Sequence, residues 1–245
     1  MKKLMITLIV LSFATTVCAQ GHKISYSVNG EEFEGYYISP QKKAPLVFMI
    51  HDWDGLTDYE IKRAQMLAEQ GYAVFAADMF GKGIRPTSTA DKKKLTGALY
   101  GDRARMRTLL EGAFTAAESQ GGNITNAIAM GYCFGGTVVL EFARSGKDLK
   151  GFVTFHGGLT TPTGQDHAQT KGQLLILHGS ADTSVTMDNF AGLAKELEQY
   201  QVKHEMITYS GAPHAFSVFG SDRYRKDADE KSWARFLGYL QETLH

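Results

Sequence analysis

Cysteine is scarce in this sequence, with two residues, Cys18 and Cys133, among 245. So few cysteines exclude a disulfide framework, and the fold must instead be held together by its core. No Cys-x-x-Cys pair is present and no resolving cysteine accompanies Cys133. Thiol–disulfide exchange is therefore not favoured as a function.

An excess of charge is also absent, because 26 lysines and arginines balance 26 aspartates and glutamates. Nucleic acid and anionic membrane surfaces both require a basic face, so neither is expected as a partner. The one basic cluster, residues 92–94, is short and is expected to be a solvated helix face. No linker, repeat or low-complexity tract divides the chain, which favours a single domain with a large core.

The first residues have the pattern of an export signal. Two lysines precede an apolar run over residues 4–17, and small residues follow it. We therefore expect a signal peptide over 1–19 and a mature domain over 20–245 that is periplasmic or secreted. The apolar run is short for a membrane span, so no stable anchor is expected after cleavage. Lipid attachment at Cys18 is the alternative, and it is disfavoured by the bulky valine before that cysteine.

Apolar segments alternate with amphipathic ones along the mature sequence. Asn29-Gly30, between two short alternating runs, is a strong type I′ hairpin signal. The continuous apolar runs that follow are typical of strands buried on both faces. Strands are expected over residues 24–28, 32–38, 46–50, 72–77, 124–130, 151–155, 174–177 and 204–209. Helices are expected over 58–70, 102–119, 136–144, 187–200 and 229–240. This order predicts an α/β fold with a mostly parallel central sheet, helices on both faces and an N-terminal antiparallel hairpin.

The segment Gly131-Tyr132-Cys133-Phe134-Gly135 joins a predicted strand to a predicted helix. A nucleophile between glycines in that context is typical of the α/β-hydrolase fold, with cysteine here in place of serine. Glycines allow the strained turn and the close approach of strand and helix. The turn would present the sulfur at the carboxyl edge of the sheet, above the positive end of a helix. Cys133 is therefore the candidate nucleophile.

Two further residues follow later strands and supply what a thiol nucleophile needs. His214 is the candidate base, and Asp182 is the candidate acid that orients it. The chain order of nucleophile, acid and base is that of the α/β-hydrolase fold. His156 and His178 also follow strands, and we expect them to make hydrogen bonds among the loops.

The loop that begins at His51 follows the first buried strand. In this fold the loop supplies one oxyanion donor and the residue after the nucleophile supplies the other. The backbone N–H groups of Trp53 and Phe134 are therefore the candidate oxyanion donors. Asp52 is a candidate to modulate the protonation of the Cys133 thiol. Metal binding by His51, Asp52 and Asp54 is disfavoured, because adjacent residues of an extended segment point in opposite directions. No metal or cofactor is expected.

The sequence resembles the dienelactone hydrolase family, which includes carboxymethylenebutenolidase-like enzymes. The resemblance covers nearly the whole mature chain, and four motifs carry it: residues 131–136, 178–182, 213–216 and 78–81. It implies a Cys–Asp–His triad that acts on lactones or esters without cofactor or metal. In the dienelactone enzymes a glutamate contacts the resting thiol, and the matching residue here is the shorter Asp52.

Substrate contacts follow less directly from the sequence. Tyr132 and Phe216 flank the nucleophile and the base and are expected to line the pocket. The relatives hold a substrate carboxylate with arginines, where this chain has Val218 and Lys82. Lys82 and the nearby Arg85 are the candidates for that role. The alternatives are Arg103, Arg223 and Arg225.

The expected function is hydrolysis of lactones or activated esters through a thioester on Cys133. A noncatalytic exported protein that binds small molecules and keeps the hydrolase fold is the alternative. An intact triad argues against it, because a binding protein does not need all three groups. The partner is a small-molecule ester or lactone, and the sequence does not determine the oligomeric state.

Overall fold

The computed structural model describes residues 19–245 of the chain. The predicted signal peptide over 1–19 therefore lies almost entirely outside the described residues and stays a prediction. No helix of the part that is described is both long enough and apolar enough to cross a bilayer.

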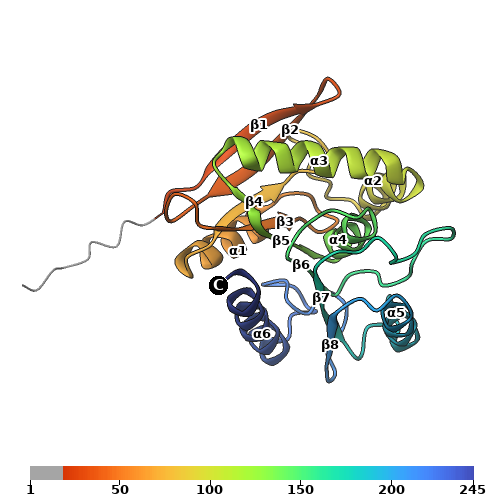
Figure 1. The fold of residues 1–245 in the computed structure, drawn as a ribbon. Coiled ribbons are helices and arrows are strands. Elements are labelled where there is room, and N and C mark those ends of the chain that lie inside the picture. Colours follow the sequence, from red (N-terminus) through yellow and green to blue (C-terminus); the bar gives the residue numbers. More distant parts are fainter. Residues whose placement is uncertain (1–18) are drawn as a thin grey trace, which may run out of the picture.

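Eight strands of the described chain form one sheet in the order β1-β2-β4-β3-β5-β6-β7-β8 (Figure 1). β1 with β2 and β2 with β4 are antiparallel pairs, and all other neighbouring pairs are parallel. The strands are β1 (His22–Val28), β2 (Glu31–Ile38), β3 (Pro45–Ile50), β4 (Ala73–Ala77), β5 (Asn123–Tyr132), β6 (Gly151–Phe155), β7 (Gln173–Gly179) and β8 (His204–Tyr209). This arrangement confirms the fold class predicted from the sequence.

The β1–β2 turn has the backbone that its sequence demands. Asn29 and Gly30 both have positive φ, 52° and 83°. A type I′ turn requires positive φ at both central residues, and its twist matches that of the flanking strands. The two residues thereby fix the hairpin at one edge of the sheet.

Helices cover both faces of the sheet (Figure 1). They are α1 (Asp58–Glu69), α2 (Thr89–Gly101), α3 (Arg103–Ser119), α4 (Phe134–Arg144), α5 (Met187–Gln199) and α6 (Lys226–Leu244). Buried side chains of α1 and α6 belong to one core, and those of α3, α4 and α5 belong to the other. The sequence placed residues 92–94 on a helix face but did not predict the extent of α2, because only Thr96 and Leu99 of this helix are buried and its apolar periodicity is weak.

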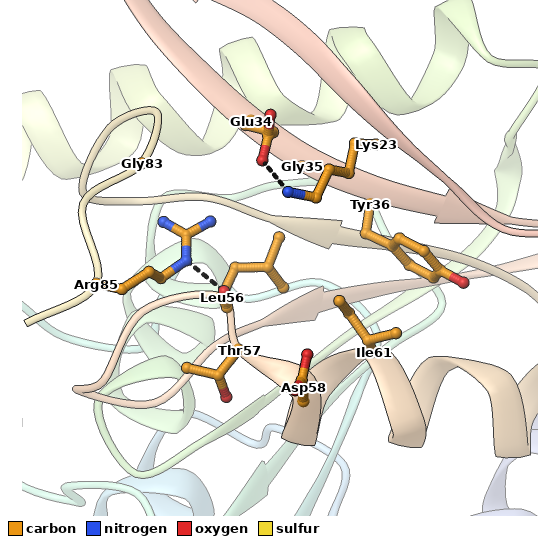
Figure 2. Close-up of a pocket in the computed structure, with 10 residues that line it drawn as sticks. All are labelled: Lys23, Glu34, Gly35, Tyr36, Leu56, Thr57, Asp58, Ile61, Gly83 and Arg85. Carbon is orange, nitrogen blue, oxygen red and sulfur yellow. Dashed lines mark hydrogen bonds and ion pairs between the residues drawn. The ribbon is translucent and has the colours of Figure 1, made fainter.

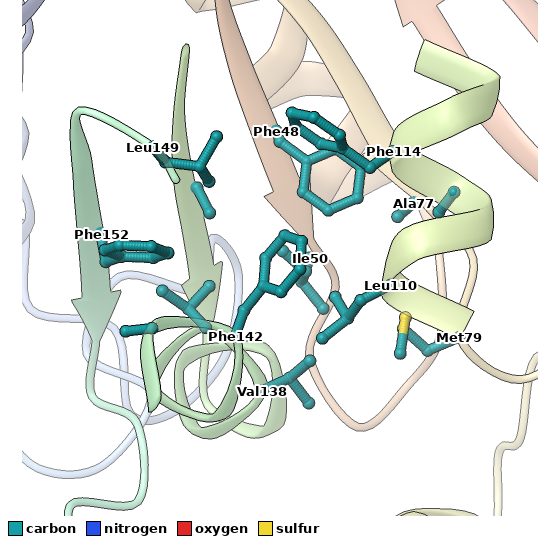
Figure 3. Close-up of a cluster of buried hydrophobic side chains, with 14 of the residues drawn as sticks. Phe48, Ile50, Ala77, Met79, Leu110, Phe114, Val138, Phe142, Leu149 and Phe152 are labelled. Atoms are coloured by element: carbon teal, nitrogen blue, oxygen red, sulfur yellow. The ribbon is translucent and has the colours of Figure 1, made fainter. Parts of the chain in front are cut away.

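Aromatic side chains hold α4 against the sheet (Figure 3). Phe48 of β3 lies edge-on to Phe114 of α3 with ring centroids 5.3 Å apart, and Phe142 of α4 lies 6.1 Å from Phe48. Burying one such side chain contributes about 1.5–3 kcal/mol. The core therefore fixes the helix whose first turn follows Cys133.

Candidate active site

Cys133 lies in a strained turn between β5 and α4. Its φ of 50° and ψ of −112° lie outside the regions that non-glycine residues favour. A Cβ on Gly131 would lie 2.3 Å from the carbonyl carbon of Gly135, and one on Gly135 would lie 2.3 Å from the Ile50 oxygen. Only glycine fits at these two positions. The Cys133 N–H donates to the Phe155 oxygen at 3.0 Å, which ties the turn to the neighbouring strand.

His214 lies between the two other members of the predicted constellation. Its Nε2 is 3.1 Å from the Cys133 sulfur, and its Nδ1 is 2.7 Å from Asp182 Oδ2. The backbone N–H groups of Ser184 and Val185 donate to Asp182 Oδ1 at 2.8 and 2.9 Å. The carboxylate is therefore held in place and accepts the Nδ1 proton, which leaves Nε2 facing the sulfur.

The electrostatics of this group favour an imidazolium. Burial acts against the charged form of His214, but hydrogen bonds to Asp182 and Cys133 outweigh it and raise the pKa of His214 to about 10. Burial of Asp182 also acts against its charge, yet the hydrogen bonds from His214, Val185 and Ser184 lower the pKa of this carboxyl. The geometry thus suits a thiolate–imidazolium pair.

The predicted oxyanion donors lie on two different parts of the chain. Phe134 is the first residue of α4, whose positive end faces the thiol turn. Trp53 lies in the loop between β3 and α1. Within residues 19–245, neither of these two N–H groups donates a hydrogen bond to the protein. Both donors are free for a substrate oxygen.

Asp52 lies in the same loop and is buried. Its Oδ1 accepts from the Asp54 N–H at 2.7 Å, and its own N–H approaches Glu60 Oε1 at 3.4 Å. Burial raises the pKa of Asp52 to about 6. Glu60 is fully buried, and burial together with the Asp52 charge raises the pKa of Glu60 to about 8. The sulfur has its hydrogen bond with His214, and none joins it to Asp52 in the described structure.

A cavity of about 420 Å³ opens beside Asp52 and Trp53. Two loops line it: the one that carries Trp53, and the one that follows His214. Its wall includes Asp52, Trp53, Ala215, Val218, Asp222 and Arg223. No triad residue lines this cavity, and it adjoins the site through Trp53 and through Ala215, which follows His214.

A model of the dienelactone hydrolase family matches residues 33–244. The chain belongs to this family. A Salmonella typhimurium protein with the provisional name carboxymethylenebutenolidase is 23% identical over 226 residues, which span 87% of this chain and 84% of the relative. A Bradyrhizobium protein provisionally named 2-oxo-3-(5-oxofuran-2-ylidene)propanoate lactonase is 27% identical over 240 residues, 90% of this chain and 94% of the relative.

Solved structures agree with these sequence relatives. A dienelactone hydrolase-like promiscuous phosphotriesterase from metagenomic libraries superimposes with a TM-score of 0.86 and 28% identity, over 93% of this chain and all of that one. The family resemblance and the expected class, a dienelactone hydrolase-like ester hydrolase, are confirmed.

The residues predicted to bind the substrate have other neighbours in this member of the family. Lys82 donates to Ser25 Oγ of β1 at 2.9 Å. In the sheet β1 lies four strand positions from β5, which leads to Cys133, and this corresponds to about 19 Å. Arg85 donates to the Leu56 oxygen and lines a separate cavity of about 370 Å³ (Figure 2), which no triad residue lines. The structure brings neither side chain to the sulfur.

The two aromatic candidates are fully buried beneath the site. The Tyr132 ring packs against the rings of Tyr59 and Phe155, each 5.0 Å away. The Phe216 ring packs against His156 at 5.3 Å. These rings support the loops from below, and their burial corrects the expectation that they line the pocket.

Sequence analysis missed that α2 contacts both candidate oxyanion residues. Lys92 forms an ion pair with Asp54 at 2.5 Å and lies 5.1 Å from the Trp53 ring, so it is not the solvated residue that we expected. Tyr100 lies 5.6 Å from the Phe134 ring. Tyr100 is partly exposed, and partial desolvation together with the nearby Cys133 raises the pKa of its hydroxyl. The spacing of Lys92 and Tyr100, a little over two helical turns, was the available signal.

Two other expectations concern polar groups around the site. His156 Nε2 lies 2.8 Å from Ser217 Oγ, and His178 Nε2 lies 3.0 Å from the Val185 oxygen, so both histidines make the expected loop contacts. In the described part of the chain, no group of three or more histidine, cysteine or acidic side chains could hold a metal ion.

Proposed function

We propose that the protein hydrolyses lactones or activated esters with Cys133 as nucleophile, His214 as base and Asp182 as the acid that orients it. The observation that carries this proposal is the pair of contacts of one imidazole, 3.1 Å to the sulfur and 2.7 Å to the carboxylate. Those contacts match the nucleophile, base and orienting acid of a triad. The Bradyrhizobium relative, whose provisional name is a lactonase, supports the lactone class.

Acylation begins with the thiol proton on His214. The thiolate forms a carbon–sulfur bond to the substrate carbonyl, and the carbonyl electron pair moves onto its oxygen. The N–H groups of Trp53 and Phe134 stabilise that oxyanion. When the intermediate collapses, the bond to the leaving oxygen breaks and the imidazolium returns its proton to that oxygen. The acyl group remains on Cys133 as a thioester.

Deacylation repeats these steps with water. His214 takes a proton from the water as the oxygen attacks the thioester, and the same two N–H groups hold the second oxyanion. Collapse breaks the carbon–sulfur bond, releases the acid and regenerates the thiolate–imidazolium pair. Asp182 stays ionised throughout and holds the imidazole in one tautomer.

The sulfur restricts the leaving groups that the reaction can use. A thiol has an ordinary pKa of about 8.5, so a thiolate leaves the tetrahedral intermediate more readily than a simple alkoxide. Attack on alkyl esters therefore tends to reverse. Lactones with enol leaving groups, aryl esters and thioesters are the better substrates.

The setting follows from the predicted export signal. We propose that the mature protein is periplasmic or secreted and acts on small molecules there. Its single thiol would then be kept in the strained turn for catalysis. A noncatalytic binding protein with the same fold is the alternative that the experiment must exclude.

Hydrolysis of a panel of aryl, enol and alkyl esters by the wild type and by Cys133→Ala tests the proposal. We expect hydrolysis of aryl and enol esters by the wild type, slower cleavage of alkyl esters, and loss of activity in the variant. Equal rates in the two proteins would contradict the assignment of Cys133 as the nucleophile. Faster cleavage of alkyl than of aryl esters would contradict the leaving-group argument.

A further inference from the structure

The loop that carries His214 is anchored by buried residues on its C-terminal side. We call residues 214–225 the base loop. Phe216 and Ser217 are fully buried within it, and Ala215 has a φ of 61°, which is strained for a residue with a side chain. Such a backbone persists only where its surroundings hold it. The contacts of Ser217 show what those surroundings are.

Ser217 Oγ lies between two buried side chains from other parts of the fold. It is 3.0 Å from the Tyr59 hydroxyl of α1 and 2.8 Å from His156 Nε2, after β6. The Tyr59 hydroxyl is also an acceptor for Arg63 Nε at 3.3 Å. These contacts form a continuous chain, Arg63–Tyr59–Ser217–His156, which we call the relay.

Arg63 fixes one hydrogen bond of the relay. A guanidinium only donates, so the Tyr59 oxygen accepts from Arg63 Nε. Either hydroxyl can be the donor between Tyr59 and Ser217, and the Ser217–His156 bond forms with a neutral imidazole. His156 Nδ1 is buried and has no hydrogen-bond partner in the described structure. A protonated His156 would therefore carry a buried N–H with no acceptor, which disfavours the charged ring.

Arg63 itself is held firmly under the base loop. Its Nη2 donates to the Ser217 oxygen at 2.9 Å and pairs with Asp229 of α6. The ring of Phe219, also in the base loop, lies 4.1 Å from the guanidinium, and Trp233 lies 4.7 Å from it. A buried, paired and stacked arginine is a fixed point. The relay therefore begins from a rigid group.

We propose that the relay positions His214 and keeps the neighbouring His156 neutral. The rings of His156 and His214 lie 5.5 Å apart, so a charge on the first would destabilise the imidazolium of the second. Besides His214, the charged groups that act on His156 are Asp182 and Arg63. Burial and the charge of His214 lower the pKa of His156 well below its ordinary value, which agrees with a neutral ring. These four residues are positioning residues, and the inference rests on the triad proposed above.

Tyr59→Phe tests the relay with little change in volume, because it leaves Arg63 Nε without its acceptor and removes one of the two side-chain partners of Ser217 Oγ. Tyr209→Phe is the matched control. Tyr209 is another buried tyrosine, 5.6 Å from the Phe216 ring, and its hydroxyl has no hydrogen-bond partner in the described structure. The measurements are kcat and KM on an aryl ester, the pH dependence of iodoacetamide alkylation of Cys133, and the melting temperature.

For Tyr59→Phe we expect kcat to fall roughly 10- to 100-fold with KM changed little, as for a misplaced catalytic group. The midpoint of the alkylation profile should rise by about half a pH unit or more, because the imidazolium that pairs with the thiolate is less stable. Tyr209→Phe should match the wild type in both measurements. Ser217→Ala should reproduce the Tyr59→Phe result.

The relay would be overturned if Tyr59→Phe and Ser217→Ala kept the wild-type kcat and alkylation profile. It would also be overturned if both variants failed to fold while Tyr209→Phe folded, since that would assign the network to stability alone. Alkylation does not require ester hydrolysis. If Cys133→Ala hydrolysed esters like the wild type, the proposed function would fail, and the alkylation profile would still decide whether the relay acts on His214.

Discussion

Glu60→Gln should change how the stability of the protein depends on pH. Glu60 is fully buried and accepts hydrogen bonds from the N–H and hydroxyl of Thr57, both at 2.8 Å. Its pKa rises from 4.5 in the unfolded chain to about 8 in the folded one, through burial and the charge of Asp52. The folded state therefore keeps a proton that the unfolded state releases. The contribution of Glu60 to the free energy of unfolding is fully present below pH 4.5 and is lost as the pH rises through 8.

The magnitude follows from the two pKa values. Between them, the free energy of unfolding contributed by Glu60 falls by up to about 1.4 kcal/mol per pH unit, or about 5 kcal/mol in all. Glutamine carries no charge and has no such dependence. It offers one acceptor oxygen in place of two, so the variant should be about 1 kcal/mol less stable than the wild type near pH 5. By pH 9 the order should reverse.

Urea denaturation from pH 5 to pH 9, followed by tryptophan fluorescence, measures both curves. The difference between the wild type and Glu60→Gln isolates Glu60 from the other titrating groups. Parallel curves across this range would refute the reasoning, because they would mean that Glu60 titrates alike in the folded and unfolded chains. Asp52→Asn should flatten the wild-type curve, since it removes the neighbouring charge.

Two further substitutions test the nucleophile turn and the triad. Gly135→Ala should lower the free energy of unfolding by about 2–3 kcal/mol or more, because the new Cβ would lie 2.3 Å from the Ile50 oxygen. Gly97→Ala, with nothing within 4 Å, should leave stability unchanged or raised; thermal unfolding compares the two, and similar melting temperatures would contradict the steric argument. Asp182→Asn should lower kcat on an aryl ester roughly 10³- to 10⁴-fold, by analogy with serine proteases. Because the Asp182 hydrogen bond helps raise the pKa of His214 to about 10, the alkaline limb of the pH–rate profile should also move to lower pH, and an unmoved limb would count against that assignment.

Most of the fold could be predicted because its signals are local. Buried parallel strands are continuous apolar runs, and β6 and β8 have the bounds expected from the sequence. The Asn29-Gly30 turn is determined by two residues whose φ must be positive. The extent of α2 was not predicted because the helix buries only Thr96 and Leu99, so its packing leaves little periodicity in the sequence.

Within the candidate site, the triad could be predicted from the sequence because each member follows a strand. The carboxyl ends of parallel strands meet at one edge of the sheet. For the remaining site residues, the sequence does not determine the direction in which the side chain points. Lys82 follows β4 as expected, but its side chain extends to β1. Tyr132 and Phe216 adjoin catalytic candidates, yet their rings turn into the core. The relay joins residues up to 158 positions apart and leaves no mark in local spacing.

Mass spectrometry of acid-quenched enzyme most directly tests the central claim, that Cys133 carries the acyl group. An aryl ester mixed with the wild type and quenched during turnover should leave the acyl mass on the peptide that contains Cys133. Asp182→Asn should form this adduct more slowly than the wild type, and Cys133→Ala should carry none. Hydrolysis that proceeds with no adduct on Cys133, or with the adduct on another residue, would contradict the account.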